Sequence, residues 1–251
     1  MLVVTTSEVE LECQAKLLAE ELHLPFMKEE EMAGDAYLVR VSADRLSLAE
    51  PSAQLSPISV DFLTKQMRYR CQRASLRREL VARALGLKHN TCPRIVDATA
   101  GLGQDSFILA CLGFDVWLIE RSPVIYALLI DGMRRAAQDD AVAPIISRMH
   151  GVKGDAITWL GQQSHQPDII YLDPMFPRRT KSALSKKEMR IFHDVVGEDL
   201  DANALFEVAI TCAAQRVVVK RPRLAAALMG RRPTYSILGS SNRFDIYVAS
   251  S

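Results

Sequence analysis

The sequence predicts an α/β fold with a mostly parallel sheet, helices on both faces and an antiparallel hairpin at the end. From Arg94 onward, short β-branched runs alternate with longer segments of helical periodicity. The segment PDIIYLDP, residues 167–174, is apolar at its centre, as in a strand that is buried on both faces. Residues 235–250 have the pattern of a closing hairpin.

The first sixty residues have a different pattern, which predicts a small α+β subdomain. A helix is expected over 9–24 and a strand pair over 36–50, followed by a proline-bearing stretch. The next segment is a connector, much of it a basic helix from Lys65 to Arg83. The predicted domains are 1–60 (the α+β subdomain), 61–93 (the basic helical connector) and 94–251 (the domain that carries the sheet).

Within the third domain, strands and helices follow one another in order. Gly113 ends the first helix, and Pro123 occupies the first helical position of the second, which has basic residues near its end. Strands are expected over 94–100, 115–121, 167–174 and 216–222, and a weaker segment around IISRMH, residues 145–150, counts as the third strand, so that 167–174 is the fourth. Helices are expected over 106–114, 122–139 and 204–214.

Composition excludes several classes of protein. With 251 residues, 49% of them hydrophobic and 24% charged, the chain can bury a full core and is not disordered. The five cysteines are scattered without a CxxC pair, so neither a disulfide framework nor a zinc site is predicted. No apolar run approaches the roughly 20 residues of a membrane span, and the N-terminus lacks a basic signal start. A cytoplasmic protein with no metal and no membrane partner is expected.

The net charge of +1 hides a strong regional asymmetry. Residues 65–94 hold nine Lys or Arg and a single acid, Glu79, and two further basic groups follow residue 177 and the strand 216–222. Such asymmetry favours a polyanionic partner, although each group alone could be a solvated surface. The candidate RNA contacts are Arg68, Arg73, Arg77, Arg78, Arg178, Arg179, Lys181, Lys220 and Arg221.

The segment DATAGLGQD, residues 97–105, joins the first strand of the sheet to the first helix. Gly101 and Gly103 let the backbone approach a ligand closely, beside the free N–H groups of a helix start. The third glycine of a dinucleotide motif and the lysine of a P-loop are both missing. Asp97 and Asp105 would repel a pyrophosphate, so a cationic or zwitterionic ligand is favoured.

Two further acids follow the next strands. Glu120 ends the second strand, where a carboxylate can bond the hydroxyls of an adenosine ribose, and Gly154-Asp155 follows the third. Together with the acidic glycine loop, these positions fit S-adenosylmethionine better than NAD. An NAD-dependent oxidoreductase remains a disfavoured alternative.

The fourth strand ends in YLDPMFPRRTKS, residues 171–182. DPMF resembles the Asn/Asp-Pro-Pro-aromatic motif of enzymes that methylate amines of nucleic acids, with Met175 in the third place. The Asp173 carboxylate and the Pro174 carbonyl can accept the N–H groups of an exocyclic amine, and Phe176 can stack on a flipped base. A proton leaves after the transfer, so no strong base is required. The alternative is a rigid turn with a helix cap.

Longer motifs make a resemblance specific. DATAGLGQD, LIERSPVIYALLIDGMRRA, YLDPMFP followed by KSALSKKEMR, VVVKRP and RFDIY resemble the ribosomal RNA small subunit methyltransferase J family, from about Val60 to the C-terminus. The resemblance implies a Rossmann-like class I methyltransferase with a seven-stranded sheet. It implies transfer from S-adenosylmethionine to the N2 amine of guanine 1516 in 16S rRNA, as naked rRNA or in the small ribosomal subunit. Donor contacts then fall on Gln104, Asp105, Glu120, Arg121, Gly154, Asp155 and Asp173.

Two alternatives of other kinds remain open. An acid-Pro-x-aromatic motif can also hold the N6 amine of adenine in RNA or DNA. A non-catalytic RNA-binding assembly factor could retain affinity for the donor. The sequence does not determine the oligomeric state, and a monomer is assumed.

Overall fold

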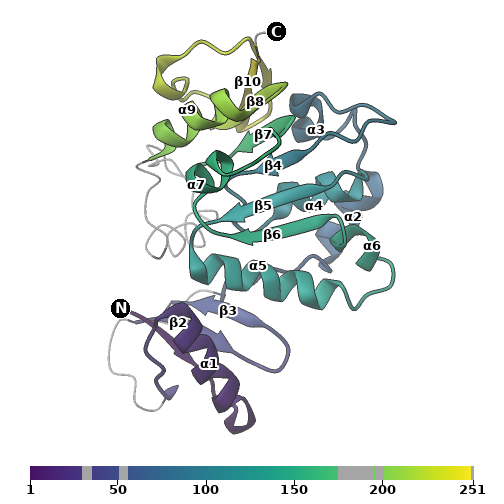
Figure 1. The fold of residues 1–251 in the computed structure, drawn as a ribbon. Helices are drawn as coiled ribbons and strands as arrows, with labels where there is room; N and C mark the ends of the chain where they lie inside the picture. Colours follow the sequence, from purple (N-terminus) through teal and green to yellow (C-terminus); the bar gives the residue numbers. More distant parts are fainter. Residues whose placement is uncertain (30–35, 51–55, 175–194, 196–200, 250–251) are drawn as a thin grey trace. The chain divides into compact units, whose positions relative to one another are not determined.

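The computed structural model describes residues 1–29, 36–50, 56–174, 195 and 201–249, drawn in colour in Figure 1. The described residues form two compact units. The first contains residues of 1–61 and 122–135, and the second contains residues of 62–121, 136–174 and 201–249. The domain limits at 60 and 93 stay a prediction.

The first unit contains a three-stranded sheet, a helix packed on it and a second, longer helix. Strand β2 (Tyr37–Val41) lies in the middle, parallel to β1 (Leu2–Thr5) and antiparallel to β3 (Leu46–Ala49). Helix α1 (Glu12–Leu22) follows a 3-10 turn over Val9–Leu11. The predicted helix and strand pair are confirmed. Strand β1 was not predicted, because four residues are too few to establish an alternating pattern.

Helix α5 (Pro123–Ala136) is the longer helix of the first unit, and it begins at the proline as predicted. Asp131 on α5 accepts the backbone N–H of Leu46 at 3.0 Å and pairs with Arg135 at 2.8 Å. A Cβ at position 132 would collide with the Val60 side chain, so only Gly132 permits this close approach.

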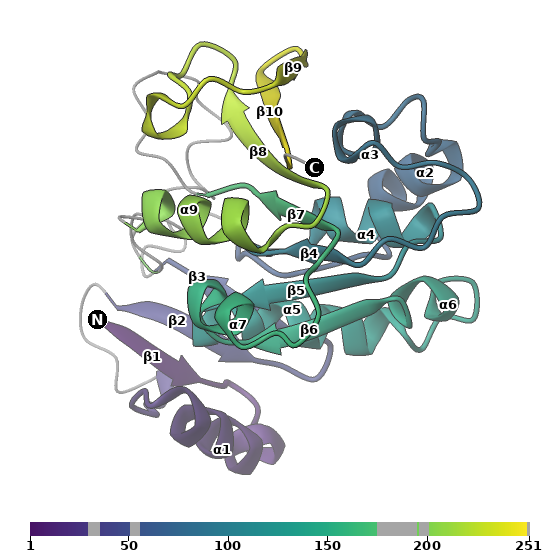
Figure 2. The ribbon, with the colours of Figure 1, turned by 45° about the horizontal axis from the view of Figure 1, so that its top comes forward.

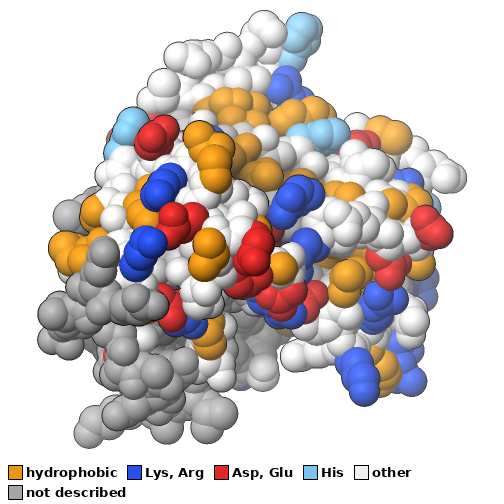
Figure 3. Space-filling view, turned by 90° about the horizontal axis from the view of Figure 1, so that it is seen from below, with side chains coloured by type: hydrophobic (Ala, Val, Ile, Leu, Met, Phe, Trp, Pro, Cys, Tyr) orange, Lys and Arg blue, Asp and Glu red, His pale blue; other side chains and the backbone are white. Residues whose placement is uncertain are grey.

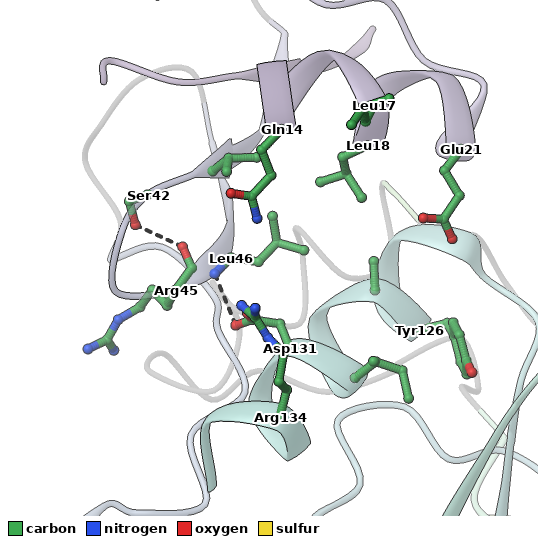
Figure 4. Close-up of a pocket in the computed structure, with 13 residues that line it drawn as sticks. Gln14, Leu17, Leu18, Glu21, Ser42, Arg45, Leu46, Tyr126, Asp131 and Arg134 are labelled. Carbon is green, nitrogen blue, oxygen red and sulfur yellow. Dashed lines mark hydrogen bonds and ion pairs between the residues drawn. The ribbon is translucent and has the colours of Figure 1, made fainter. Parts of the chain in front are cut away.

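A cavity of about 370 Å³ lies within the first unit, and Figure 4 shows side chains of α1, α5 and β3 around it. Leu17, Leu18 and Leu46 supply apolar lining, and Tyr126 and Arg134 line it from α5. None of the residues that line this cavity is a predicted site residue. All of the predicted donor contacts belong to the second unit.

The second unit is built on a seven-stranded sheet of the order β6-β5-β4-β7-β8-β10-β9, counted over the described residues. The strands from β6 to β8 run parallel, and β10 is antiparallel to both β8 and β9. This topology confirms the predicted parallel sheet with a closing hairpin. The strands are β4 (Ile95–Asp97), β5 (Val116–Glu120), β6 (Met149–Lys153), β7 (Ile169–Leu172), β8 (Arg216–Pro222), β9 (Tyr235–Leu238) and β10 (Asn242–Val248).

Helices cover both faces of this sheet. Helices α7 and α9 pack together on one face, and α3 and α4 lie on the other (Figures 1 and 2). Strand β7 is buried along its whole length between them, as its apolar sequence predicted. The helices are α2 (Lys65–Arg73), α3 (Leu80–Leu85), α4 (Gln104–Cys111), α6 (Ala143–Ile146), α7 (Ala156–Gly161) and α9 (Ala202–Cys212), with a 3-10 turn over Leu228–Gly230.

The continuous basic helix from Lys65 to Arg83 is a wrong prediction. Helix α2 ends at Ala74, whose backbone is extended with ψ of 136°. The Ser75 carbonyl then accepts the N–H groups of Arg78 and Glu79, both at 3.0 Å, before α3 begins. Apart from the single serine, the residues at this break are compatible with a helix, which is why their pattern did not reveal it.

The structure contains a disulfide, although the scattered cysteines predicted no disulfide framework. Cys71 on α2 is bonded to Cys111 at the end of α4, with Cα atoms 5.8 Å apart. The two cysteines are separated by 40 residues in sequence and belong to no motif, so their spacing contained no signal. The bond links α2 covalently to the helix that follows the glycine loop.

Candidate active site

The parallel register brings three predicted residues, Asp97, Asp173 and Lys220, to one edge of the sheet. Asp97 at the end of β4 lies opposite Leu118 of β5 and Tyr171 of β7. Leu172 lies opposite Val219 of β8, so Asp173 and Lys220 follow on neighbouring strands. The carboxyl edge of a parallel sheet is where α/β proteins bind ligands.

The glycine loop is a turn with free space around its first glycine. Gly101 and Gly103 have φ of +53° and +71°, which favour glycine. A Cβ at Gly101 would meet no described atom nearer than the Thr99 carbonyl oxygen at 4.0 Å. A ligand can therefore approach the backbone here, next to the exposed Gln104 that begins α4.

Glu120 ends β5 and is hydrogen-bonded to the glycine loop. Its Oε2 atom accepts the N–H of Gly101 at 2.9 Å, and the residue is only 7% exposed. An ionised carboxylate at the end of a strand can accept hydrogen bonds from ligand hydroxyls as well as from the backbone. Glu120 could therefore hold a polar ligand group beside Gly101.

Asp97 is buried and forms hydrogen bonds to residues within and just after the glycine loop. It is 2% exposed, and it accepts the backbone N–H of Thr99 at 3.2 Å and the Ser106 hydroxyl at 2.5 Å. Burial raises the pKa of Asp97 to about 7, although both hydrogen bonds oppose this rise. Its predicted contact with a cofactor stays a prediction.

Lys220 on β8 bridges two predicted carboxylates. Its Nζ atom lies 2.9 Å from Oδ2 of Asp105 on α4 and 2.8 Å from Oδ2 of Asp173 after β7. Its side chain is 24% exposed. Burial would lower the pKa of Lys220, but the two carboxylates raise it well above the usual value. The ammonium therefore stays charged at neutral pH.

Two further side chains complete this cluster. The Tyr171 hydroxyl donates to Oδ2 of Asp105 at 2.8 Å, and Arg70 on α2 lies 3.4 Å from Oδ1. Burial would raise the pKa of Asp105, but Lys220, Tyr171 and Arg70 together hold it below its usual range. Arg70 also pairs with Glu79 at 2.9 Å. Asp105 is thus ionised and held from several sides.

Asp173 is fixed through its backbone as well. Its N–H donates to the Thr99 hydroxyl at 2.6 Å, and Pro174 behind it is buried. Asp173 is the first residue of DPMF, here called the reaction motif. The reaction motif is therefore hydrogen-bonded through Asp173 to Thr99, in the glycine loop that follows β4. Four further candidates, Phe176, Arg178, Arg179 and Lys181, lie outside the described residues and stay predictions.

The predicted donor contacts Gly154 and Asp155 lie where β6 leads into α7. The N–H of Gly154 donates to the Glu120 carbonyl at 3.0 Å. Asp155 caps α7, accepting the backbone N–H and the hydroxyl of Thr158, both at 2.8 Å. Partial burial opposes a low pKa for Asp155, but the Thr158 bonds lower it. Arg121 pairs with Asp201 at 2.8 Å, and its contact with a cofactor stays a prediction.

The basic candidates fall into two groups. Arg68 pairs with Asp139 at 2.8 Å, and Arg221 is only 8% exposed and donates to the Ala226 carbonyl. At several places on the face that Figure 3 draws, acidic and basic side chains lie next to one another. The other group consists of Arg73, Arg77 and Arg78, which are exposed and form no ion pair with a described residue.

Sequence reasoning missed the roles of Thr99, Tyr171 and Arg70, and it assigned Lys220 to RNA. Tyr171 has the pattern of an ordinary strand aromatic, and Lys220 stands beside Arg221 in a basic run. The available signal was the register: residues that end adjacent parallel strands become neighbours.

No group of three potential metal ligands occurs within the described residues. Among the helices described, none has the length and apolar character to cross a membrane.

Comparison with known proteins identifies relatives over nearly the whole chain. A family model described as "Putative SAM-dependent methyltransferase" matches residues 18–249. Ribosomal RNA small subunit methyltransferase J of Thioalkalivibrio sulfidiphilus is 51% identical over 239 residues, covering 94% of this chain and 92% of its own. The protein of the same name from Nitrosococcus oceani is 48% identical, covering 93% of each chain.

A solved structure extends the comparison to three dimensions. The crystal structure of a SAM-dependent methyltransferase from Neisseria gonorrhoeae has a TM-score of 0.75 to this chain at 33% identity. It covers 98% of this chain and 95% of its own. The architecture described above is therefore found in a solved methyltransferase.

Proposed function

This chain belongs to the ribosomal RNA small subunit methyltransferase J family, and from that premise we propose that it methylates the N2 amine of guanine 1516 in 16S rRNA. The observation that carries the proposal is the joining of the glycine loop to the reaction motif by the Thr99 to Asp173 bond and the Lys220 bridge. A donor on the loop and an amine at Asp173 would then be neighbours.

The residues at the sheet edge fit S-adenosylmethionine. The open turn at Gly101 supports close approach of a ligand, and Glu120 beside it suits the two ribose hydroxyls. The Glu120 carboxylate beside the loop favours a cationic or zwitterionic ligand over a pyrophosphate, whereas Lys220 and Arg70 already balance the charge of Asp105. S-adenosylmethionine, when bound, supplies a methyl group on a positively charged sulfur.

The reaction requires orientation more than proton transfer. The amine of guanine is conjugated to the ring and is a weak nucleophile, so its N–H groups must be held while its lone pair faces the methyl carbon. The Asp173 carboxylate and the Pro174 carbonyl are the acceptors for those N–H groups. With the donor bound, the nitrogen held by these acceptors would form a bond to the methyl carbon while the carbon–sulfur bond broke with its electron pair on sulfur, and the nitrogen would then lose a proton to water.

The exposed arginines support an RNA-binding surface on α2 and the turn that follows. Tyr69 is 57% exposed, and the guanidinium of Arg73 lies 4.7 Å from the centre of its ring. Arginine and an aromatic ring together suit an unpaired base, and Arg77 and Arg78 suit phosphates.

Charge reversal at Arg73, Arg77 and Arg78 tests this surface. The affinity for rRNA should fall, and its dependence on salt should weaken by about 0.7 to 0.9 in logarithmic slope for each phosphate that the variant no longer binds. Filter binding at several salt concentrations measures both quantities. An unchanged slope would show that these arginines are only solvated.

Product analysis tests the proposed reaction itself. Small subunits or 16S rRNA lacking the modification are incubated with enzyme and labelled donor, and digested nucleosides are identified by mass spectrometry. N2-methylguanosine at 1516 is the expected product. N6-methyladenosine would instead support the adenine alternative, and the absence of any methyl transfer in a single turnover would support a non-catalytic assembly factor.

A cytoplasmic monomer is part of this proposal. The substrate is 16S rRNA, as naked rRNA or in the small ribosomal subunit, so the enzyme must work where ribosomes assemble. Sedimentation at working concentrations would test the monomeric state.

A further inference from the structure

We propose that Lys220 is a positioning residue for methyl transfer, because its ammonium joins Asp105 at the donor loop to Asp173 in the reaction motif. This inference rests on the proposed function. It replaces the role in phosphate binding that the basic run VVVKRP had indicated. Lys220 would act through the two carboxylates and would touch neither the methyl group nor the amine.

The geometry of the bridge supports this role. Lys220 comes from β8, Asp105 from α4 and Asp173 from the segment after β7, so one ammonium connects three elements. The two Nζ to oxygen distances, 2.9 Å and 2.8 Å, are those of charged hydrogen bonds. A lysine with two of its three donors on carboxylates is poorly placed to bind a phosphate as well.

The balance of charge explains why a cation is needed. Asp97 at the end of β4, Asp105 on α4 and Asp173 after β7 act electrostatically on one another and on the Tyr171 hydroxyl. The opposing cations are Lys220 and Arg70, and Arg70 is shared with Glu79 at the start of α3. Without Lys220, Asp105 and Asp173 would repel each other, and Asp173 would hold a proton or turn away.

The same charges exclude a role for Lys220 as a base. An ammonium between two carboxylates stays protonated at neutral pH, so it cannot accept the proton that leaves the amine. What it can do is keep Asp173 ionised and fixed as the acceptor of the amine N–H groups. The expected signature is therefore a rate that depends on pH, with donor and rRNA both saturating.

Two substitutions separate these roles. Lys220→Met keeps the length of the side chain without its charge, and Lys220→Arg restores the charge. Lys88→Met is the matched control, because Lys88 is exposed and lies outside the site. Single-turnover rates with saturating S-adenosylmethionine and rRNA are measured from pH 5.5 to 9, together with the affinity for rRNA.

Lys220→Met should be slowed at least tenfold at pH 5.5, and its rate should rise toward the wild-type rate as the pH increases, because Asp173 without its opposite charge holds a proton more tightly. Lys220→Arg should recover part of the rate, and Lys88→Met should match the wild type. The wild-type product tests the proposed function, and the ratio of variant to wild type tests Lys220.

Three results would overturn the proposal. One is a wild-type rate for Lys220→Met across the pH range. Another is a loss by the same factor at every pH, which a merely structural lysine would cause. The third is weaker rRNA binding with a lower salt slope and an unchanged rate at saturation, which would return Lys220 to the RNA contacts.

Discussion

The sheet edge holds its carboxylates in two different ways. Asp97, Glu120 and Asp155, here called the backbone-held carboxylates, accept N–H groups from Thr99, Gly101 and Thr158 respectively. Asp105 and Asp173, the cation-bridged carboxylates, share the ammonium of Lys220. The first group shapes the loops around the proposed donor site, and the second links that site to the proposed reaction motif.

This difference separates local from distant determinants. Thr99 and Thr158 lie two and three residues from the acids they contact. Lys220 lies 115 residues from Asp105 and 47 from Asp173. Asp97 and Asp155 therefore depend on their own turns, whereas Glu120 reaches a backbone N–H that is 19 residues away and a bridged acid depends on the assembled sheet. Loss of a bridged acid should affect the reaction, and loss of a backbone-held acid should affect donor affinity or stability.

Asp173→Ala should have the largest effect. The single-turnover rate should fall by at least about a hundredfold, as when a positioned polar group is removed from an active site. The affinity for S-adenosylmethionine, measured by calorimetry, should fall by a smaller factor than the rate, because Asp173 is one of several predicted donor contacts and the loop residues are intact. Retained activity would remove Asp173 from the reaction and with it the distinction between the two groups.

Asp97→Asn should have the next largest effect, on stability. The pKa of Asp97 is about 7 in the folded protein and 3.8 in the reference state, so the folded state binds the proton more tightly. The wild type should therefore lose stability as pH rises from about 4 to 7, and the variant should not. Relative to the wild type, the variant should gain on the order of 2 kcal/mol in unfolding free energy between pH 5 and pH 8.

Urea unfolding of both proteins at the two pH values measures this difference. Ser106→Ala at the same pH values is a useful companion, because it removes the hydroxyl that Asp97 accepts. A wild-type stability that did not change relative to Asp97→Asn would mean that Asp97 is ionised throughout, and its burial would then need another explanation.

Glu120→Ala should have a smaller effect, confined to donor binding. Loss of hydrogen bonds from a carboxylate to the ribose should weaken S-adenosylmethionine binding about tenfold or more, corresponding to roughly 1.5 kcal/mol. The rate at saturating donor should change little. Calorimetry with Glu120→Ala beside Glu120→Gln measures the effect, and an unchanged affinity in both would remove Glu120 from the ribose.

Asp155→Ala should have the smallest effect if Asp155 is only a cap. Loss of the N-cap of α7 should cost about 1 kcal/mol of unfolding free energy. Thermal unfolding measures this cost, and Asp155→Ser, which retains a capping oxygen, should recover most of it. A tenfold loss of donor affinity in Asp155→Ala alone would instead make this acid a cofactor contact as well.

The sequence sufficed for β4, β5, β7 and β8 because these strands are apolar and separated by clear helices, whereas the segment before Lys153 was too weakly patterned to give the bounds of β6. The glycine loop, Glu120 and Asp173 could be found for the same reason, since each ends a strand. The break after Ala74 could not be found, because the helix stops among residues that also suit a helix. The Cys71–Cys111 bond and the Lys220 bridge were missed because both join residues that only the folded chain brings together.

The most direct test of the division between the two groups is a crystal structure of the protein with S-adenosylhomocysteine bound. Both ribose hydroxyls should lie within about 3.2 Å of the Glu120 carboxylate, with the sulfur facing Asp173 and Lys220 still bridging Asp105 and Asp173. A ribose bound away from Glu120, or a Lys220 side chain turned out to solvent in that complex, would contradict the account.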